Sequence, residues 1–158
     1  NAAQAYYFET RIRLFDMLWH CLAKAMPETL PAGHFASIFG TVIAGKHPLT
    51  EQAYTLVEPQ MGGWGATSTR DGLDAMYSAS HGDTFNCPVE ICEARYGIEV
   101  MYKQLNEHVD DASLYKGGRG LSTRYRMHGE GILSFGCSHY NTNVWSLEGG
   151  SEGTTNKL

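Results

Sequence analysis

Apolar residues recur at helical spacing between about Thr10 and Ala25, where they form a single stripe. The members of the stripe are Ile12, Phe15, Trp19, Leu22 and Ala23, and it is widened by Leu18 and Met26. This spacing predicts an amphipathic α-helix whose stripe packs on the core. Thr10 is a suitable N-cap, and Pro27 ends the helix because proline cannot continue it.

Strands are predicted further along the chain. Residues 31–45 are expected to form a loop and a short strand, and residues 53–57 a further strand. After Tyr96 the apolar positions include a period-two run. Residues 98–105 and 121–127 are therefore predicted strands.

The last part of the chain predicts a hairpin and an extended tail. The glycine-containing step at residues 128–131 is a hairpin candidate that leads into a strand at residues 132–135. The tail from Cys137 onward is polar and glycine-rich, and we expect only a partner to order it. No repeat or linker marks a second domain. Residues 1–158 are thus predicted to form one α+β segment, with one amphipathic N-terminal helix, glycine-rich loops and an antiparallel, strand-rich C-terminal half.

Composition limits the classes of partner. Hydrophobic residues make up 42% of the 158 residues and charged residues only 18%, below the usual value of about a quarter. This low charge, with 18 glycines, predicts a surface that is largely buried in an assembly. The net charge of −5 argues against nucleic acid as a partner. The longest uncharged apolar run, residues 35–45, is shorter than the ~20 residues that span a bilayer, so no membrane insertion is expected.

The glycine-rich stretch around Trp64 is the first candidate for chemistry. Gly62, Gly63 and Gly65 flank the tryptophan and predict a tight turn or the close approach of another group, since glycine has no Cβ. Their backbone amides are candidates for cradling a phosphate. The stretch lacks the Gly-Lys-Ser/Thr ending of a P-loop, so a purely structural turn is the alternative.

Acidic residues follow this stretch. His81 and Asp83 could ligate a divalent cation together with a residue such as Glu90, although a Gly-Asp step is also a common turn. Glu90 and Glu93 lie three residues apart, on one face of a helix expected to open near Pro88. They are candidates for a general base and its orienting partner. The alternative is that they only favour the helix dipole.

A second glycine turn carries two basic residues. Lys116 and Arg119 enclose two glycines and could meet an anion, but a turn between strands explains the same pattern. No nucleophile motif of the Gly-x-Ser-x-Gly type is present. These motifs do not define a complete active site.

Five motifs, in order, resemble those of the hydantoinase B/oxoprolinase family. They are Glu9-Thr10-Arg11-Ile12 with Asp16; Ala25-Met26-Pro27-Glu28 with Pro31-Ala32; Gly62-Gly63-Trp64-Gly65-Ala66 with Asp71-Gly72 and with Asn86-Cys87-Pro88-Val89-Glu90 and Glu93; Lys116-Gly117-Gly118-Arg119-Gly120; and Trp145-Ser146-Leu147-Glu148-Gly149-Gly150-Ser151-Glu152-Gly153. The likeness spans almost the whole chain. It implies the C-terminal part of a hydantoinase B-type subunit, and it adds Asp71 and Asn86 to the candidates for a substrate or phosphate loop.

The resemblance implies an ATP-dependent amidohydrolase that opens a cyclic amide such as hydantoin or 5-oxoproline. ATP and Mg²⁺ are then expected mainly on a hydantoinase A-type partner, and any divalent metal in a more N-terminal part of the subunit. The expected partners are this ATP-binding component, the remainder of the hydantoinase B-type subunit and a small-molecule substrate. The isolated chain is expected to be inactive. The resemblance implies a cytoplasmic location, and a reducing compartment disfavours disulfides among the four cysteines.

Two other functions fit the same sequence. The chain resembles subunits of ATP-dependent acetone and acetophenone carboxylases, which would differ in the substrate pocket. It could also be a structural and interaction module that holds subunits together without donating a catalytic group. The low charge, the many glycines and the tail favour that second alternative.

Overall fold

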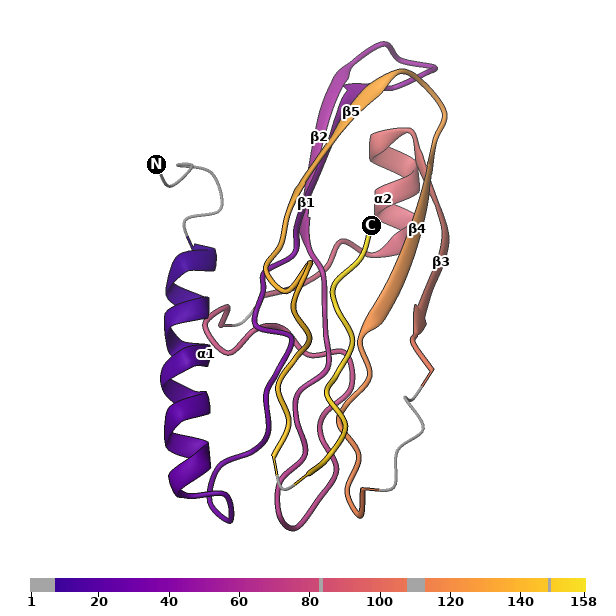
Figure 1. The fold of residues 1–158 in the computed structure, drawn as a ribbon. Coiled ribbons are helices and arrows are strands. Elements are labelled where there is room, and N and C mark those ends of the chain that lie inside the picture. The colour runs from indigo at the N-terminus through magenta and orange to yellow at the C-terminus, as the bar shows by residue number, and fades with distance from the viewer. Residues whose placement is uncertain (1–7, 83, 108–112, 148) are drawn as a thin grey trace.

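The computed structural model describes residues 8–82, 84–107, 113–147 and 149–158 (Figure 1). The elements, in chain order, are α1 (Phe8–Ala25), β1 (Gly40–Lys46), β2 (Ala53–Pro59), α2 (Val89–Tyr96), β3 (Ile98–Leu105), β4 (Leu121–Met127) and β5 (Gly131–Gly136). An N-terminal helix with antiparallel strands confirms the predicted α+β class. Neither helix in the described residues is long and apolar enough to cross a membrane.

The strands form two antiparallel sheets. In one, β1 lies between β2 and β5, and in the other β3 pairs with β4. Ile43 in the middle of β1 is opposite Leu56 on one side and Leu133 on the other. The hairpin predicted at residues 128–131 is wrong, because β4 and β5 belong to different sheets and the connection carries the chain from one to the other. The partner of β5 lies far earlier in the chain, and a local turn signal cannot report such a pairing.

The apolar core lies where β1 and β2 meet α2 and β3. It consists of Ile43, Tyr54, Leu56, Cys92 and Ile98. α2 begins after Pro88, as predicted, and ends at Gly97, whose φ of 57° lies in the left-handed region. Glycine adopts this conformation without a steric penalty, so it is a suitable residue to end the helix. All four cysteines are free thiols.

The apolar stripe of α1 does not face the core as predicted. The exposed members of the stripe are Phe15, Leu18, Leu22 and Met26, which are between 40% and 52% accessible. The buried side of the helix instead carries Ile12, Ala23 and the charged Asp16. The cause is that α1 stands beside the sheets and packs on irregular segments through polar contacts (Figure 1).

The N-terminal end of α1 also differs from the prediction. The helix begins at Phe8, so Thr10 lies within it and is not the N-cap. At the other end it stops at Ala25, shortly before Pro27, as predicted.

Beyond the sheets, several segments without helix or strand run side by side (Figure 1). Backbone hydrogen bonds join them: the Gly33 N–H donates to the Trp145 carbonyl at 3.1 Å, and the Asn156 N–H to the His139 carbonyl at 2.9 Å. Trp145 is 9% exposed. The prediction that only a partner orders the tail is therefore wrong, because the tail from Cys137 is bound by other parts of its own chain.

Candidate functional site

A cleft of about 750 Å³ opens among these irregular segments. Most of its lining comes from residues 60–68, 113–122, 144–147 and 150–157. Its volume lies in the range of small-molecule sites, roughly 300–1,000 Å³. Gly62, Gly63, Trp64, Gly65, Lys116 and Arg119 all line it. Most of the substrate-loop residues predicted from the sequence are thus brought together here.

The glycines around the cleft are required by close contacts between backbones. A Cβ on Gly63 would lie 1.8 Å from the carbonyl oxygen of Gly118, and a Cβ on Gly118 would lie 2.0 Å from that of Leu73. Hydrogen bonds hold the segments at this spacing, with the Gly118 N–H donating to the Trp64 carbonyl at 2.8 Å. The space beside Gly63 and Gly118 is therefore filled by neighbouring chain. These positions do not fit a phosphate.

Two carboxylates hold the second glycine turn, residues 116–120, in place through hydrogen bonds. Asp74 accepts hydrogen bonds from the Arg119 side chain at 2.5 and 2.9 Å and from its backbone N–H at 2.6 Å. Asp71 accepts one from the Lys116 N–H at 2.8 Å. The predicted residue Asp71 thus positions the turn, and the charge of Arg119 is balanced by Asp74. Lys116, half-buried in the lining, is the better candidate to meet an anionic group.

A buried amide, Gln60, connects the cleft with the sheets. It lines the cleft, is only 7% exposed, and accepts a hydrogen bond from the Thr123 hydroxyl at 3.1 Å. Its Nε2 lies 3.5 Å from the hydroxyl of Tyr125, which donates to Glu58 at 2.5 Å. Burial, followed by this contact with Glu58, raises the pKa of Tyr125. The side chain of Gln60 is thereby held in one orientation.

Glu58 is the centre of a buried polar cluster behind the cleft. It is 3% exposed and accepts hydrogen bonds from Asn86 at 2.5 Å and from Lys103 at 3.2 Å. A buried carboxylate needs such partners, because the loss of hydration is otherwise uncompensated. Asn86 therefore contacts the charge behind the cleft, although the sequence suggested a role at the substrate.

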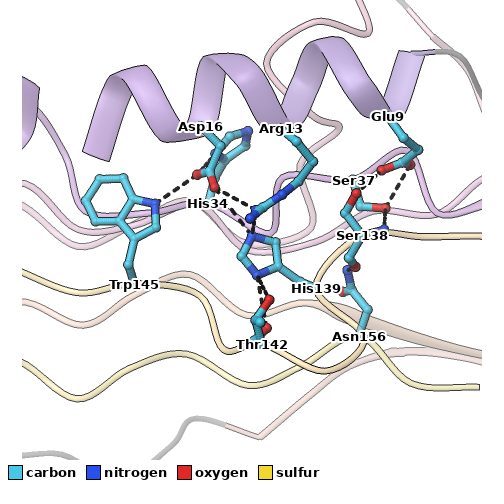
Figure 2. A network of polar contacts seen from close by, with 10 residues as sticks. All are labelled: Glu9, Arg13, Asp16, His34, Ser37, Ser138, His139, Thr142, Trp145 and Asn156. Atoms are coloured by element: carbon cyan, nitrogen blue, oxygen red, sulfur yellow. Dashed lines mark hydrogen bonds and ion pairs between the residues drawn. The ribbon is translucent and has the colours of Figure 1, made fainter. Parts of the chain in front are cut away.

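A second buried cluster joins α1 to the tail (Figure 2). Asp16, 2% exposed, accepts hydrogen bonds from Arg13 at 2.7 Å and from the indole of Trp145 at 2.9 Å. His139 lies 3.5 Å from the same carboxylate and also contacts Arg13. Burial by itself raises the pKa of Asp16, but the hydrogen bonds from His139 and Trp145 and the charge of Arg13 hold it below its ordinary value.

His34 closes this cluster from the other side. Its Nδ1 lies 3.8 Å from Asp16, its ring stacks on Trp19 with centroids 5.3 Å apart, and it is 2% exposed. Neither ring nitrogen has a hydrogen-bond partner in the described residues. Burial lowers the pKa of His34 to about 4. The imidazole is therefore neutral at physiological pH.

Glu9, near the start of α1, is a second carboxylate that links the helix to other segments of the chain (Figure 2). Its carboxylate accepts hydrogen bonds from the Ser37 hydroxyl at 3.0 Å, the Ile38 N–H at 2.7 Å and the Ser138 hydroxyl at 2.5 Å. Glu9 and Asp16 thus attach α1 to the glycine-rich segments. Neither Asp16 nor His34 is among the residues that line the cleft, although Trp145, which donates to Asp16, is. This cluster is a structural support of the cleft.

The predicted catalytic residues lie away from the cleft. Glu90 is exposed on α2, and Glu93 accepts a hydrogen bond from the Val100 N–H at 3.0 Å. His81 is tilted against the ring of Tyr77 and lines a separate apolar groove. The structure does not bring His81 together with Glu90 or Glu93, and their catalytic roles stay predictions.

The predicted metal pair is only partly described. Asp83 lies outside the described residues, so the pairing of His81 with Asp83 stays a prediction. In the part of the chain that the structure does describe, no three His, Cys, Asp or Glu side chains are grouped to hold a metal ion.

Sequence reasoning did not assign a role to Glu58, Gln60, His34 or His139. For Glu58 a signal was present, because it follows the buried Tyr54 and Leu56 at a period of two. Asp16 carried a similar signal, at helical spacing from Ile12 on the side that becomes buried. The histidines carry no such local pattern.

Comparison with known proteins identifies the class. Residues 1–158 match the Hydantoinase B/oxoprolinase family, so the chain belongs to this family. It is similar to an uncharacterized protein from Methanocaldococcus jannaschii, with 28% identity over 145 residues. The match covers 92% of this chain but 24% of the relative, so the chain spans about a quarter of that protein's length.

Proposed function

We propose that this chain forms part of the hydantoinase B-type subunit of an ATP-dependent enzyme that opens a cyclic amide of the hydantoin or 5-oxoproline type. Family membership supports the class of subunit. The observation that carries the proposal is the cleft of about 750 Å³, in which the glycine-rich segments meet beside Lys116 and Gln60. A five-membered cyclic amide offers carbonyl oxygens and a ring face, which a lysine, an amide and Trp64 can bind.

The proposal assigns the ATP chemistry to another component. An amide carbonyl is a poor electrophile, and phosphoryl transfer to its oxygen would let water attack the carbon. The two glycine-rich loops are poor fits for the phosphates of ATP, because backbone fills the space beside Gly63 and Gly118 and because Arg119 is held by Asp74. ATP and Mg²⁺ are therefore assigned to a hydantoinase A-type partner. This chain would bind and orient the ring.

A structural role without direct chemistry is the second candidate. It is favoured by the placement of the predicted acids: Glu93 is hydrogen-bonded to Val100, and Glu90 points to solvent on α2. In that case the cleft would be a gap between the glycine-rich segments, without residues that contact the substrate. The remainder of the subunit would supply every group that touches the substrate.

The experiment is a turnover assay of the purified assembly with ATP and Mg²⁺. Hydantoin or 5-oxoproline should yield ADP and the ring-opened acid, whereas ADP formed only with a ketone and bicarbonate would indicate a carboxylase. Replacing Lys116 by methionine should lower kcat/KM by roughly 10- to 150-fold, because a charged hydrogen bond contributes ~1.5–3 kcal/mol.

Lys46→Met is the matched control, since Lys46 is exposed at the end of β1 outside the cleft. The Lys116 and Lys46 variants should assemble equally well. Unchanged kinetics of the Lys116 variant in a competent assembly would favour the structural role.

A further inference from the structure

The side of α1 that points away from the molecule is strongly apolar. We call it the outer face, and it consists of Leu14, Phe15, Leu18, Cys21 and Leu22 together with Met26 directly after the helix, all exposed. These positions repeat at intervals of three and four residues, which is the spacing at which one helix packs along another. No other part of the described chain covers them. A soluble protein rarely leaves so continuous an apolar helix face in water.

The helix cannot rotate about its axis to bury the outer face in place of its inner side. Asp16 and Glu9 are bound to Trp145 and Ser138 of the tail, so the rotation of α1 about its axis is fixed (Figure 2). Turning the outer face inward would bury leucines but would break these bonds and leave two carboxylates without partners. Their desolvation would then be uncompensated.

The charges around the outer face indicate the kind of partner. Between Thr10 and Met26 the chain contains a single acidic residue, Asp16, and it is buried. The exposed charges on the helix beside the face are Arg11, which also donates to the Ser80 carbonyl at 3.4 Å, and Lys24, one near each end; the exposed Glu28 follows beyond Met26, after the helix has ended. A second copy of α1 would bring basic residues against basic residues in either direction. A helix with acidic flanks would complement both ends.

We propose that the outer face of α1 docks an amphipathic helix with acidic flanks. This helix would be supplied by the remainder of the hydantoinase B-type subunit, outside the part to which this chain corresponds. The relative from Methanocaldococcus jannaschii has about three quarters of its length outside the match. This inference rests on the proposed function, since it names the surface through which the chain joins the remainder of that subunit.

Site-specific photo-cross-linking of the assembly tests the proposal. A benzophenone amino acid replaces Leu18 on the outer face or, as the control, Leu49, which is 88% exposed between β1 and β2. The assembly is purified through a tag on this chain, and cross-linked peptides are sequenced. The position of Leu18 should link to an apolar, helix-periodic peptide with Asp or Glu flanks from a hydantoinase B-type sequence. The position of Leu49 should not link to that peptide.

A link from Leu18 to a second copy, to an unrelated protein or to nothing would overturn the proposal. Charge substitution supplies the independent readout: Leu18→Glu with Leu22→Glu should reduce retention of the docked segment about tenfold or more, whereas Leu49→Glu should not. Unchanged retention of the double variant would also contradict the docking.

The two proposals can fail separately. A Leu18 cross-link in an assembly that opens no cyclic amide would contradict the proposed function alone. Ring opening by an assembly in which Leu18 is not cross-linked would contradict the docking alone.

Discussion

The two ends of this molecule are stabilised in different ways. At the sheet end, Ile43, Leu56 and Ile98 form an apolar core between strands and α2. At the other end, glycine-rich segments lie backbone against backbone, and buried carboxylates such as Asp16 attach them to α1. Apolar burial is non-directional and tolerates changes of similar volume. The second end depends on specific hydrogen bonds and on the absence of side chains.

This difference bears on function because the cleft lies at the glycine-rich end. The shape of a site built from closely spaced backbones is set by contacts such as that between Gly63 and Gly118. The sheet end provides the scaffold from which Gln60 reaches the cleft. Substitutions at the two ends should therefore have distinct signatures.

The largest effect is expected for Asp16→Ala. The substitution leaves Arg13, whose side chain is 33% exposed, and the buried His139 ring and Trp145 indole without their acceptor. Each buried donor left unpaired costs ~1–3 kcal/mol, so the total loss should be roughly 2–6 kcal/mol. Equilibrium unfolding in urea measures the loss. The control is Glu99→Ala, which removes an exposed ion pair with Arg126 and should cost below ~1 kcal/mol. Similar losses for both variants would show that the polar cluster does not hold α1.

The next largest effect is the difference in stability between alanine substitutions at two adjacent glycines. Gly118→Ala should cost ~1–3 kcal/mol, because its Cβ would meet the Leu73 carbonyl. Gly117→Ala should be neutral or stabilise by ~0.4–1 kcal/mol, since nothing lies within 4 Å of its Cβ and the unfolded chain loses freedom. Thermal unfolding of the two variants side by side measures the contrast. Equal stability would mean that the segments move apart without cost.

The smallest effect is a pH dependence carried by His34. The unfolded imidazole has its ordinary pKa of 6.5, whereas in the folded protein the pKa is about 4. The unfolded state therefore binds more protons between these values. The stability that His34 contributes is complete above pH 6.5 and is lost as the pH falls toward 4. Between pH 7 and pH 5 the loss should be about 2 kcal/mol.

His34→Phe is the variant that isolates this effect. Phenylalanine fits among the aromatic neighbours Trp19, Phe35 and Trp64 and has no nitrogens to leave unpaired. The unfolding free energy is measured at pH 5 and pH 7 for both proteins. Its decrease between pH 7 and pH 5 should be about 2 kcal/mol smaller in the variant than in the wild type. Asp16, with an ordinary value of 3.8, contributes below this window. An unchanged slope would exclude His34 as its source.

Local patterns were sufficient for most elements of the fold. The helix that ends before Pro27, the strands near residues 53–57, 98–105 and 121–127, and the helix after Pro88 all follow from periodicity and helix-end signals. The family-like motifs around Trp64, Lys116 and Trp145 also lie where chain segments meet around the cleft. These features depend on neighbouring residues in the sequence, and the sequence displays them directly.

The rotation of α1 shows where such reasoning fails. Phe15 and Leu18 satisfy the helical stripe as well as Ile12 does, and hydrophobicity alone favours burying all three. The buried side is decided by Asp16, whose partner Trp145 comes from the far end of the chain. The site has the same limitation, since Gln60 gains its orientation from Thr123 and Tyr125 on β4.

By itself, the sequence determined the class of the fold and the membership of its family, whereas the structure decided which glycines leave no room for a Cβ. The tertiary structure decided which face of α1 is buried, that β5 pairs with β1, and that the segments around Trp64, Lys116 and Trp145 meet at one cleft. The physical reason is the range of the interactions. Helix and turn signals act over a few residues, whereas strand pairing, buried ion pairs and the lining of a cleft join residues that the sequence keeps far apart.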